Sequence, residues 1–142
     1  MFFTVSLVNQ GITPDTPSPA RILLIEDNET SRQLMSDYLE YHGYQVHAIA
    51  DGIAWTTAMQ QIHPHLILLD LKLPEIDGFA ILNELTQQPE WSAIPVIIVS
   101  AFAFQADRKR ALQLGAKRYF VKPVNLVQLR QAIAEELGFP HE

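Results

Sequence analysis

Five polar residues stand where apolar stretches of the sequence end. Glu26 and Asp27 follow the run ILLI, Asp70 follows LILL, Ser100 follows PVIIV, and Lys122 follows YFV. Carboxylates brought together repel one another and raise one another's pKa, and a hard cation such as Mg²⁺ relieves that repulsion through oxygen ligands. A carboxylate beside a metal ion and an amine can attack phosphorus and form an aspartyl phosphate. These residue types therefore indicate phosphoryl chemistry, with a hydroxyl and an ammonium to hold the phosphoryl oxygens.

That chemistry requires the five side chains to meet at one edge of a sheet. The stretches at 22–26, 66–70 and 95–99 are apolar on both faces, which is typical of parallel strands covered by helices on both sides. Right-handed crossovers then give a doubly wound α/β fold, whose sites lie outside the carboxyl ends of the strands. Two further strands are expected at 44–50 and from 118 to the residue before Pro123. Helices are expected within 30–43, 51–62, 78–88, 105–116 and 125–138, the last with Asn125 as N-cap.

Composition limits the class of protein. The chain has 142 residues, of which 48% are hydrophobic and 18% charged, and a formal net charge of −6. These values suit one globular domain and argue against a basic nucleic-acid-binding surface. There is no cysteine, which fits a reducing, cytoplasmic compartment, and no apolar run is long enough to span a bilayer. We expect residues 1–20, which end in GITPDTPSPA, to form a flexible arm, and residues 139–142 to form a short tail.

The segments LLIEDN, LILLDLKLPEIDG, PVIIVSA and YFVKP, in this order, resemble the receiver domain of bacterial two-component response regulators. The resemblance covers about residues 21–138. It implies a flavodoxin-like (βα)5 fold with strand order 2-1-3-4-5. It also implies a stand-alone signalling switch rather than a conventional enzyme. A histidine kinase or histidine phosphotransfer protein would supply the phosphoryl group, and an unknown downstream protein would receive the signal.

The resemblance assigns Asp70 as the phosphoacceptor. It implies a Mg²⁺ ion bound by Asp27, Asp70 and the backbone carbonyl of Lys72, with Glu26 acting largely through a water molecule. Ser100 would contact the phosphoryl group.

Three further assignments concern the last strand. The resemblance implies that Lys122 contacts the phosphoryl group and that the Lys122–Pro123 peptide bond is cis. Tyr119 lies where the family has a rotating switch aromatic, and Ser100 would take part in the same switch. An ordinary core role for Tyr119 is the alternative.

Other functions stay open from the sequence alone. The chain could be a receiver-like interaction module that works without phosphorylation, and Asp70 could merely cap a loop. A phosphatase of the haloacid-dehalogenase type is disfavoured, because those enzymes carry an acid where this chain has Lys72. The segment HPH at 63–65 is expected to be an exposed loop rather than a metal pair. The basic residues between 108 and 118 form either a solvated face or a docking patch.

Overall fold

A five-stranded parallel sheet forms the centre of the computed structural model, which describes residues 18–138. Its strand order is β2-β1-β3-β4-β5, as the resemblance implied. The predictions for residues 1–17 and 139–142 lie outside the described residues. The strands are β1 (Arg21–Ile25), β2 (Gln45–Ile49), β3 (Leu66–Leu69), β4 (Val96–Ser100) and β5 (Arg118–Val121). The helices between and after them are α1 (Glu29–Tyr41), α2 (Trp55–Ile62), α3 (Gly78–Gln87), α4 (Gln105–Gln113) and α5 (Leu126–Leu137).

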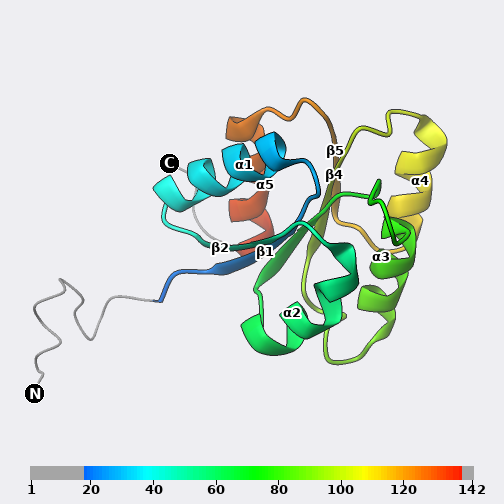
Figure 1. Ribbon diagram of the computed structural model, residues 1–142, viewed down its shortest axis with the longest axis horizontal. Helices are drawn as coiled ribbons and strands as arrows, with labels where there is room; N and C mark the ends of the chain where they lie inside the picture. The colour runs from blue at the N-terminus through cyan, green and yellow to red at the C-terminus, as the bar shows by residue number, and fades with distance from the viewer. Residues whose placement is uncertain (1–17, 139–142) are drawn as a thin grey trace, which may run out of the picture.

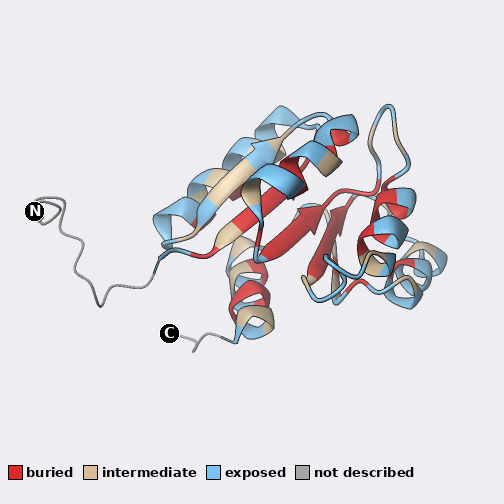
Figure 2. Cartoon of the chain, turned by 90° about the horizontal axis from the view of Figure 1, so that it is seen from below, coloured by how far each residue is buried: buried red, intermediate tan, exposed pale blue. Residues whose placement is uncertain are grey.

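The helices form a layer on each face of the sheet (Figure 1). Successive side chains of β1 point to opposite faces, so Leu23 and Ile25 pack with α2, α3 and α4, whereas Ile22 and Leu24 pack with α1 and α5. All four are buried, and Figure 2 shows the buried strands between helices whose outer faces are exposed. This double cover explains why the central strands are apolar without alternation.

Three helices begin at a residue whose side chain accepts a backbone N–H of the first turn. Asn28 caps α1, Asp77 caps α3, and Asn125 caps α5 as predicted. These caps fix where each loop ends and the helix begins. No helix within residues 18–138 is long and apolar enough to cross a membrane.

The helix predicted within 51–62 is confirmed, but it occupies only the later part of that segment. Residues Gly52–Ala54 form a short 3₁₀ turn, η2, capped by Asp51, and the α-helix begins only at Trp55. Gly52 is buried, and a Cβ atom there would lie 2.6 Å from Ile76 Cγ2. The close approach of the β3–α3 loop is a tertiary contact, which local periodicity does not reveal. The other boundaries differ from the predictions by a few residues.

Candidate functional site

Backbone hydrogen bonds beyond the strand ends place three of the predicted site residues. The Glu26 N–H donates to Ile49 O at 3.0 Å, and the Asp70 N–H donates to Ile25 O at 3.0 Å. On the other side of the sheet, the Lys122 N–H donates to Ser100 O at 2.8 Å. Each of these hydrogen bonds extends the pairing of parallel strands by one residue. The side chains of Glu26, Asp70 and Lys122 therefore project from the carboxyl-terminal edge of the sheet on a backbone that is fixed in position.

Three carboxylates meet at this edge, as the sequence predicted. Oxygen atoms of Glu26, Asp27 and Asp70 lie within 4.8 Å of one another. Glu26 is 1% exposed and Asp70 is 4% exposed, whereas Asp27 is exposed to solvent. Among residues 18–138 this is the one group of three or more side chains that could hold a metal ion.

Lys122 faces the two buried carboxylates. Its Nζ atom lies 2.7 Å from Glu26 Oε1 and 3.0 Å from Asp70 Oδ2. Burial by itself lowers the pKa of Lys122, but the hydrogen bonds to these two acids outweigh burial, so the pKa is raised. Burial raises the pKa of Glu26, and the close contact with the Lys122 ammonium and the hydrogen bond from the Asn28 backbone N–H offset only part of that rise. One ammonium among three carboxylates leaves an excess of negative charge with oxygen ligands only, which fits a hard divalent cation.

The loop after β3 is closed tightly behind Asp70. The Lys72 N–H donates to Asp70 Oδ1 at 3.0 Å, and Lys72 forms an isolated bridge with Asp77. Gly78 then starts α3 against the loop backbone, where a Cβ atom would lie 2.5 Å from Leu71 Cα and 2.8 Å from Asp70 O. Glycine is required here for close approach.

Ser100 and Tyr119 are buried together on the β4–β5 side. Ser100 Oγ accepts the Phe102 N–H at 3.2 Å, and the Tyr119 hydroxyl donates to Phe102 O at 2.8 Å. Burial raises the pKa of Tyr119, Asp107 adds to the rise, and a hydrogen bond with the Ser100 side chain offsets part of it. The Tyr119 hydroxyl therefore stays protonated at neutral pH. This link through the Phe102 carbonyl was not foreseen from the sequence, because a backbone acceptor leaves no signal in residue type.

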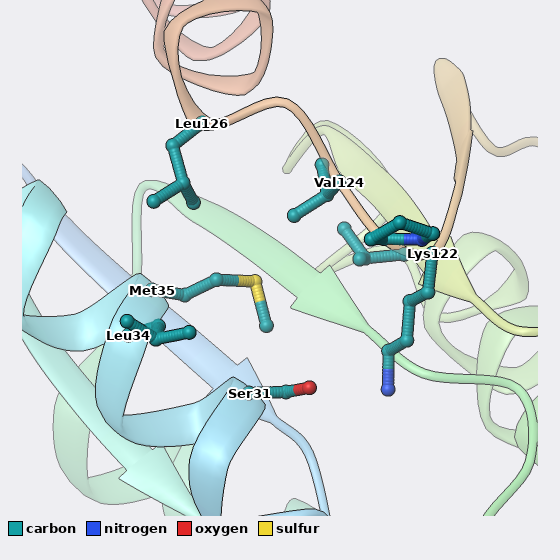
Figure 3. Close-up of a pocket in the computed structure, with 8 residues that line it drawn as sticks. Ser31, Leu34, Met35, Lys122, Val124 and Leu126 are labelled. Carbon is teal, nitrogen blue, oxygen red and sulfur yellow. The ribbon is translucent and has the colours of Figure 1, made fainter.

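A small apolar cavity adjoins the site between α1 and the β5–α5 loop, with a volume of about 140 Å³ (Figure 3). Met35, Val124 and Leu126 line its apolar part, and the Lys122 ammonium and the Ser31 hydroxyl lie toward one end. The Lys122–Pro123 peptide bond at its edge is cis. An apolar surface thus lies next to the ammonium that contacts Asp70.

The HPH segment is held by Arg21, and among residues 18–138 its histidines belong to no group of three or more potential metal ligands. The Arg21 N–H donates to His65 Nδ1 at 2.9 Å, and the Arg21 guanidinium donates to His63 O. Both histidines are exposed, as the loop interpretation predicted.

The basic residues between 108 and 118 are not a uniform solvated patch. Arg110 lies over the Phe79 ring at 4.0 Å, and Arg108 donates to a carbonyl of β5. Arg118 forms ion pairs with two glutamates of α5 at 2.7 and 2.9 Å. Three of the five cations therefore contact their own domain, and Lys109 and Lys117 are the two for which the described residues provide no such partner.

The comparisons with known proteins agree with this geometry. The family model of the response regulator receiver domain matches residues 22–134, so the chain belongs to that family. Its parallel order 2-1-3-4-5 with flanking helices is the flavodoxin-like fold of CheY-like receivers. The family is one of signalling domains of two-component systems, not of classical enzymes.

Individual relatives are similar over nearly their whole length. The polar-differentiation response regulator DivK of Brucella ovis is 34% identical over 117 residues, which are 82% of this chain and 95% of DivK. The receiver domain of the sensor histidine kinase PA1611 from Pseudomonas aeruginosa PAO1 is 32% identical, with a TM-score of 0.77 over 84% of this chain and 98% of that one. That structure has a magnesium ion in its active site cleft. The Mn²⁺-bound response regulator Rcp1 is 30% identical, with a TM-score of 0.73 over 82% of this chain and 93% of Rcp1.

Proposed function

We propose that this chain is a phosphoacceptor switch in which Asp70 receives a phosphoryl group from a phosphohistidine donor with the help of Mg²⁺. The observation that carries the proposal is the contact of Lys122 Nζ with Asp70 Oδ2 at 3.0 Å, within a cluster of three carboxylates. A buried carboxylate fixed by one ammonium and one backbone N–H is a positioned nucleophile. The metal-bound relatives support the same assignment for this edge of the sheet.

In the transfer, an oxygen of Asp70 attacks the phosphorus in line with the leaving nitrogen. The new O–P bond forms as the P–N bond of phosphohistidine breaks, and the imidazole leaves with the electron pair and takes up a proton. Lys122 and Ser100 donate to the phosphoryl oxygens. A divalent cation held by Glu26, Asp27, Asp70 and the Lys72 carbonyl would neutralise part of the charge on those oxygens. Later attack of water on the phosphorus breaks the bond to Asp70 and releases phosphate.

Partners follow from this chemistry. The donor is a histidine kinase or a histidine phosphotransfer protein, and the apolar cavity beside Lys122 offers it a surface to pack against. The signal leaves through contact with a further protein. Because phosphohistidine is made at the expense of ATP, we infer a cytoplasmic location.

The direct test uses acetyl phosphate as donor and intact mass as readout. With Mg²⁺ the protein should gain one phosphoryl group, and the gain should vanish in EDTA and in Asp70→Asn. Glu75→Gln is the matched control, since it removes one exposed carboxylate from the same loop. Labelling that persists in EDTA or in Asp70→Asn contradicts the assignment. A folded parent that is never labelled favours the phosphorylation-independent interaction module instead.

A further inference from the structure

A chain of close contacts connects the site hydroxyl to the surface of α4. Ser100 Oγ accepts from the Phe102 N–H at 3.2 Å, and Phe102 O accepts from the Tyr119 hydroxyl at 2.8 Å. At the other end of the same tyrosine, Tyr119 O accepts from Arg108 Nη1 at 3.3 Å. Three hydrogen bonds therefore run from the edge that holds the carboxylates to an exposed residue of α4.

The Arg108 guanidinium contacts both the backbone carbonyl and the aromatic ring of Tyr119. The guanidinium carbon lies 6.0 Å from the Tyr119 ring centroid, in addition to the bond from Nη1 to the carbonyl. Tyr119 is buried at 6% exposure, and its ring and carbonyl both contact Arg108, so a rotation of this side chain away from Phe102 would disturb the arginine contact. Arg108 thus contacts Tyr119, whose hydroxyl donates to the Phe102 carbonyl.

The contact between Arg108 and Tyr119 is important because α4 buries little apolar surface of its own. Ala111 is the one buried residue of α4, and Phe104, the N-cap residue, makes no side-chain capping bond. With so little apolar burial, polar contacts such as that of Arg108 decide how the helix sits against β5.

We propose that Arg108 is a positioning residue for the phosphoryl transfer. It holds Tyr119 with its hydroxyl on the Phe102 carbonyl, and so keeps the 100–102 segment and the Ser100 hydroxyl placed for the phosphoryl group. The inference rests on the proposed function, because it needs phosphorylation at Asp70.

The chain contains a matched control in the next residue. Lys109 is exposed, and among the described residues its side chain has no hydrogen bond or ion pair. Arg108→Gln and Lys109→Gln remove the same charge from the same helix, so any general electrostatic effect on an anionic donor is the same in both. The measured quantity is the rate of phosphorylation by acetyl phosphate in Mg²⁺, resolved into the maximal rate and the donor concentration for half-maximal rate.

Arg108→Gln should lower the maximal rate about threefold to tenfold and leave the half-saturating donor concentration unchanged, since Arg108 does not touch the donor. Lys109→Gln should stay within about twofold of the parent. Tyr119→Phe removes the hydroxyl that reaches Phe102 and should lower the rate as well. The double variant Arg108→Gln with Tyr119→Phe should be no slower than the slower single variant, because both act through one contact chain.

Two results overturn the inference while the proposed function stands. One is an Arg108→Gln rate equal to that of Lys109→Gln, and the other is a double variant whose loss is the product of the single losses. Arg108→Met, which keeps a long side chain but can neither donate a hydrogen bond nor carry a charge, covers the case in which Arg108→Gln does not fold. A rate equal to that of the parent in this variant then also counts against the inference. A folded parent that takes no phosphoryl group refutes the proposed function and this inference together.

Discussion

Helices α3 and α4 lie on the same face of the sheet but are attached to it in different ways. α3 buries five of its ten residues, including Phe79, Leu82 and Leu85. α4 buries one residue of nine, Ala111. Specific side-chain contacts of α4 include the Arg110 guanidinium over the Phe79 ring. Apolar burial thus fixes α3, whereas a few specific side-chain contacts fix α4.

The difference follows from what each helix supports. α3 begins at Gly78, which packs on the backbone of Leu71 and Asp70, so any shift of α3 would displace the loop that carries Asp70. α4 follows Ser100 and contacts Tyr119, so it lies between the site and the surface. An element held by few apolar contacts opens at lower free energy than one held by many, and such elements are the ones that change conformation in signalling. Three pairs of substitutions test whether α3 and α4 are attached to the sheet in these different ways.

The largest effect is expected from truncation of a leucine in each helix. Leu82 of α3 is 0% exposed, whereas Leu112 of α4 is 40% exposed. Leu82→Ala should lower the free energy of unfolding by about 2–5 kcal/mol, because it leaves a cavity in the core. Leu112→Ala should change it by no more than about 0.5 kcal/mol. Urea denaturation measures both, and losses of similar size would contradict the stated difference in attachment.

A smaller effect is expected where α3 meets the end of α4. Thr86 of α3 donates to Leu114 O at 2.8 Å, and a Cβ atom on Gly115 would lie 2.7 Å from Thr86 Cγ2. Gly115 has φ +111°, so Gly115→Ala combines backbone strain with a clash against a short branched side chain. Gly43, with φ +96° and open space around its Cβ position, is the matched control that carries the strain alone.

Gly115→Ala should therefore cost at least about 1 kcal/mol more in unfolding free energy than Gly43→Ala, since each carries roughly 1–2 kcal/mol of backbone strain. Equal losses of unfolding free energy would show that the Thr86 side chain can move aside without destabilising the protein. The packing between α3 and the end of α4 would then not be tight.

The smallest effect is expected from the arginine that lies over Phe79. Arg110→Gln should lower the free energy of unfolding by about 0.5–1 kcal/mol through loss of the cation–π contact. Lys109→Gln serves as the control of equal charge and should be close to neutral. Hydrogen exchange adds a local measure, because Arg110→Gln should speed exchange in α4 and leave α3 unchanged. Faster exchange in both helices would mean that they open as one unit.

Much of the site was predictable from residue types at strand ends. Glu26, Asp70, Ser100 and Lys122 each follow an apolar run, and parallel strands bring such positions to one edge. The features of the site and its surroundings that could not be predicted depend on contacts between segments that are distant in the sequence. The basic cluster at 108–118 is an example, because the sequence does not show that Arg118 pairs with α5.

The sequence by itself determined the order of elements, the cap at Asn125, and the set of polar side chains at the strand ends. These follow from hydrophobic patterns and local hydrogen bonding, which act over a few residues. Tertiary structure alone decided the 3₁₀ turn at Gly52, the close approach at Gly78 and the contact of Arg108 with Tyr119. Those features depend on which atoms of remote segments come within a few ångströms, and that is set by the packing of the whole domain rather than by any local pattern.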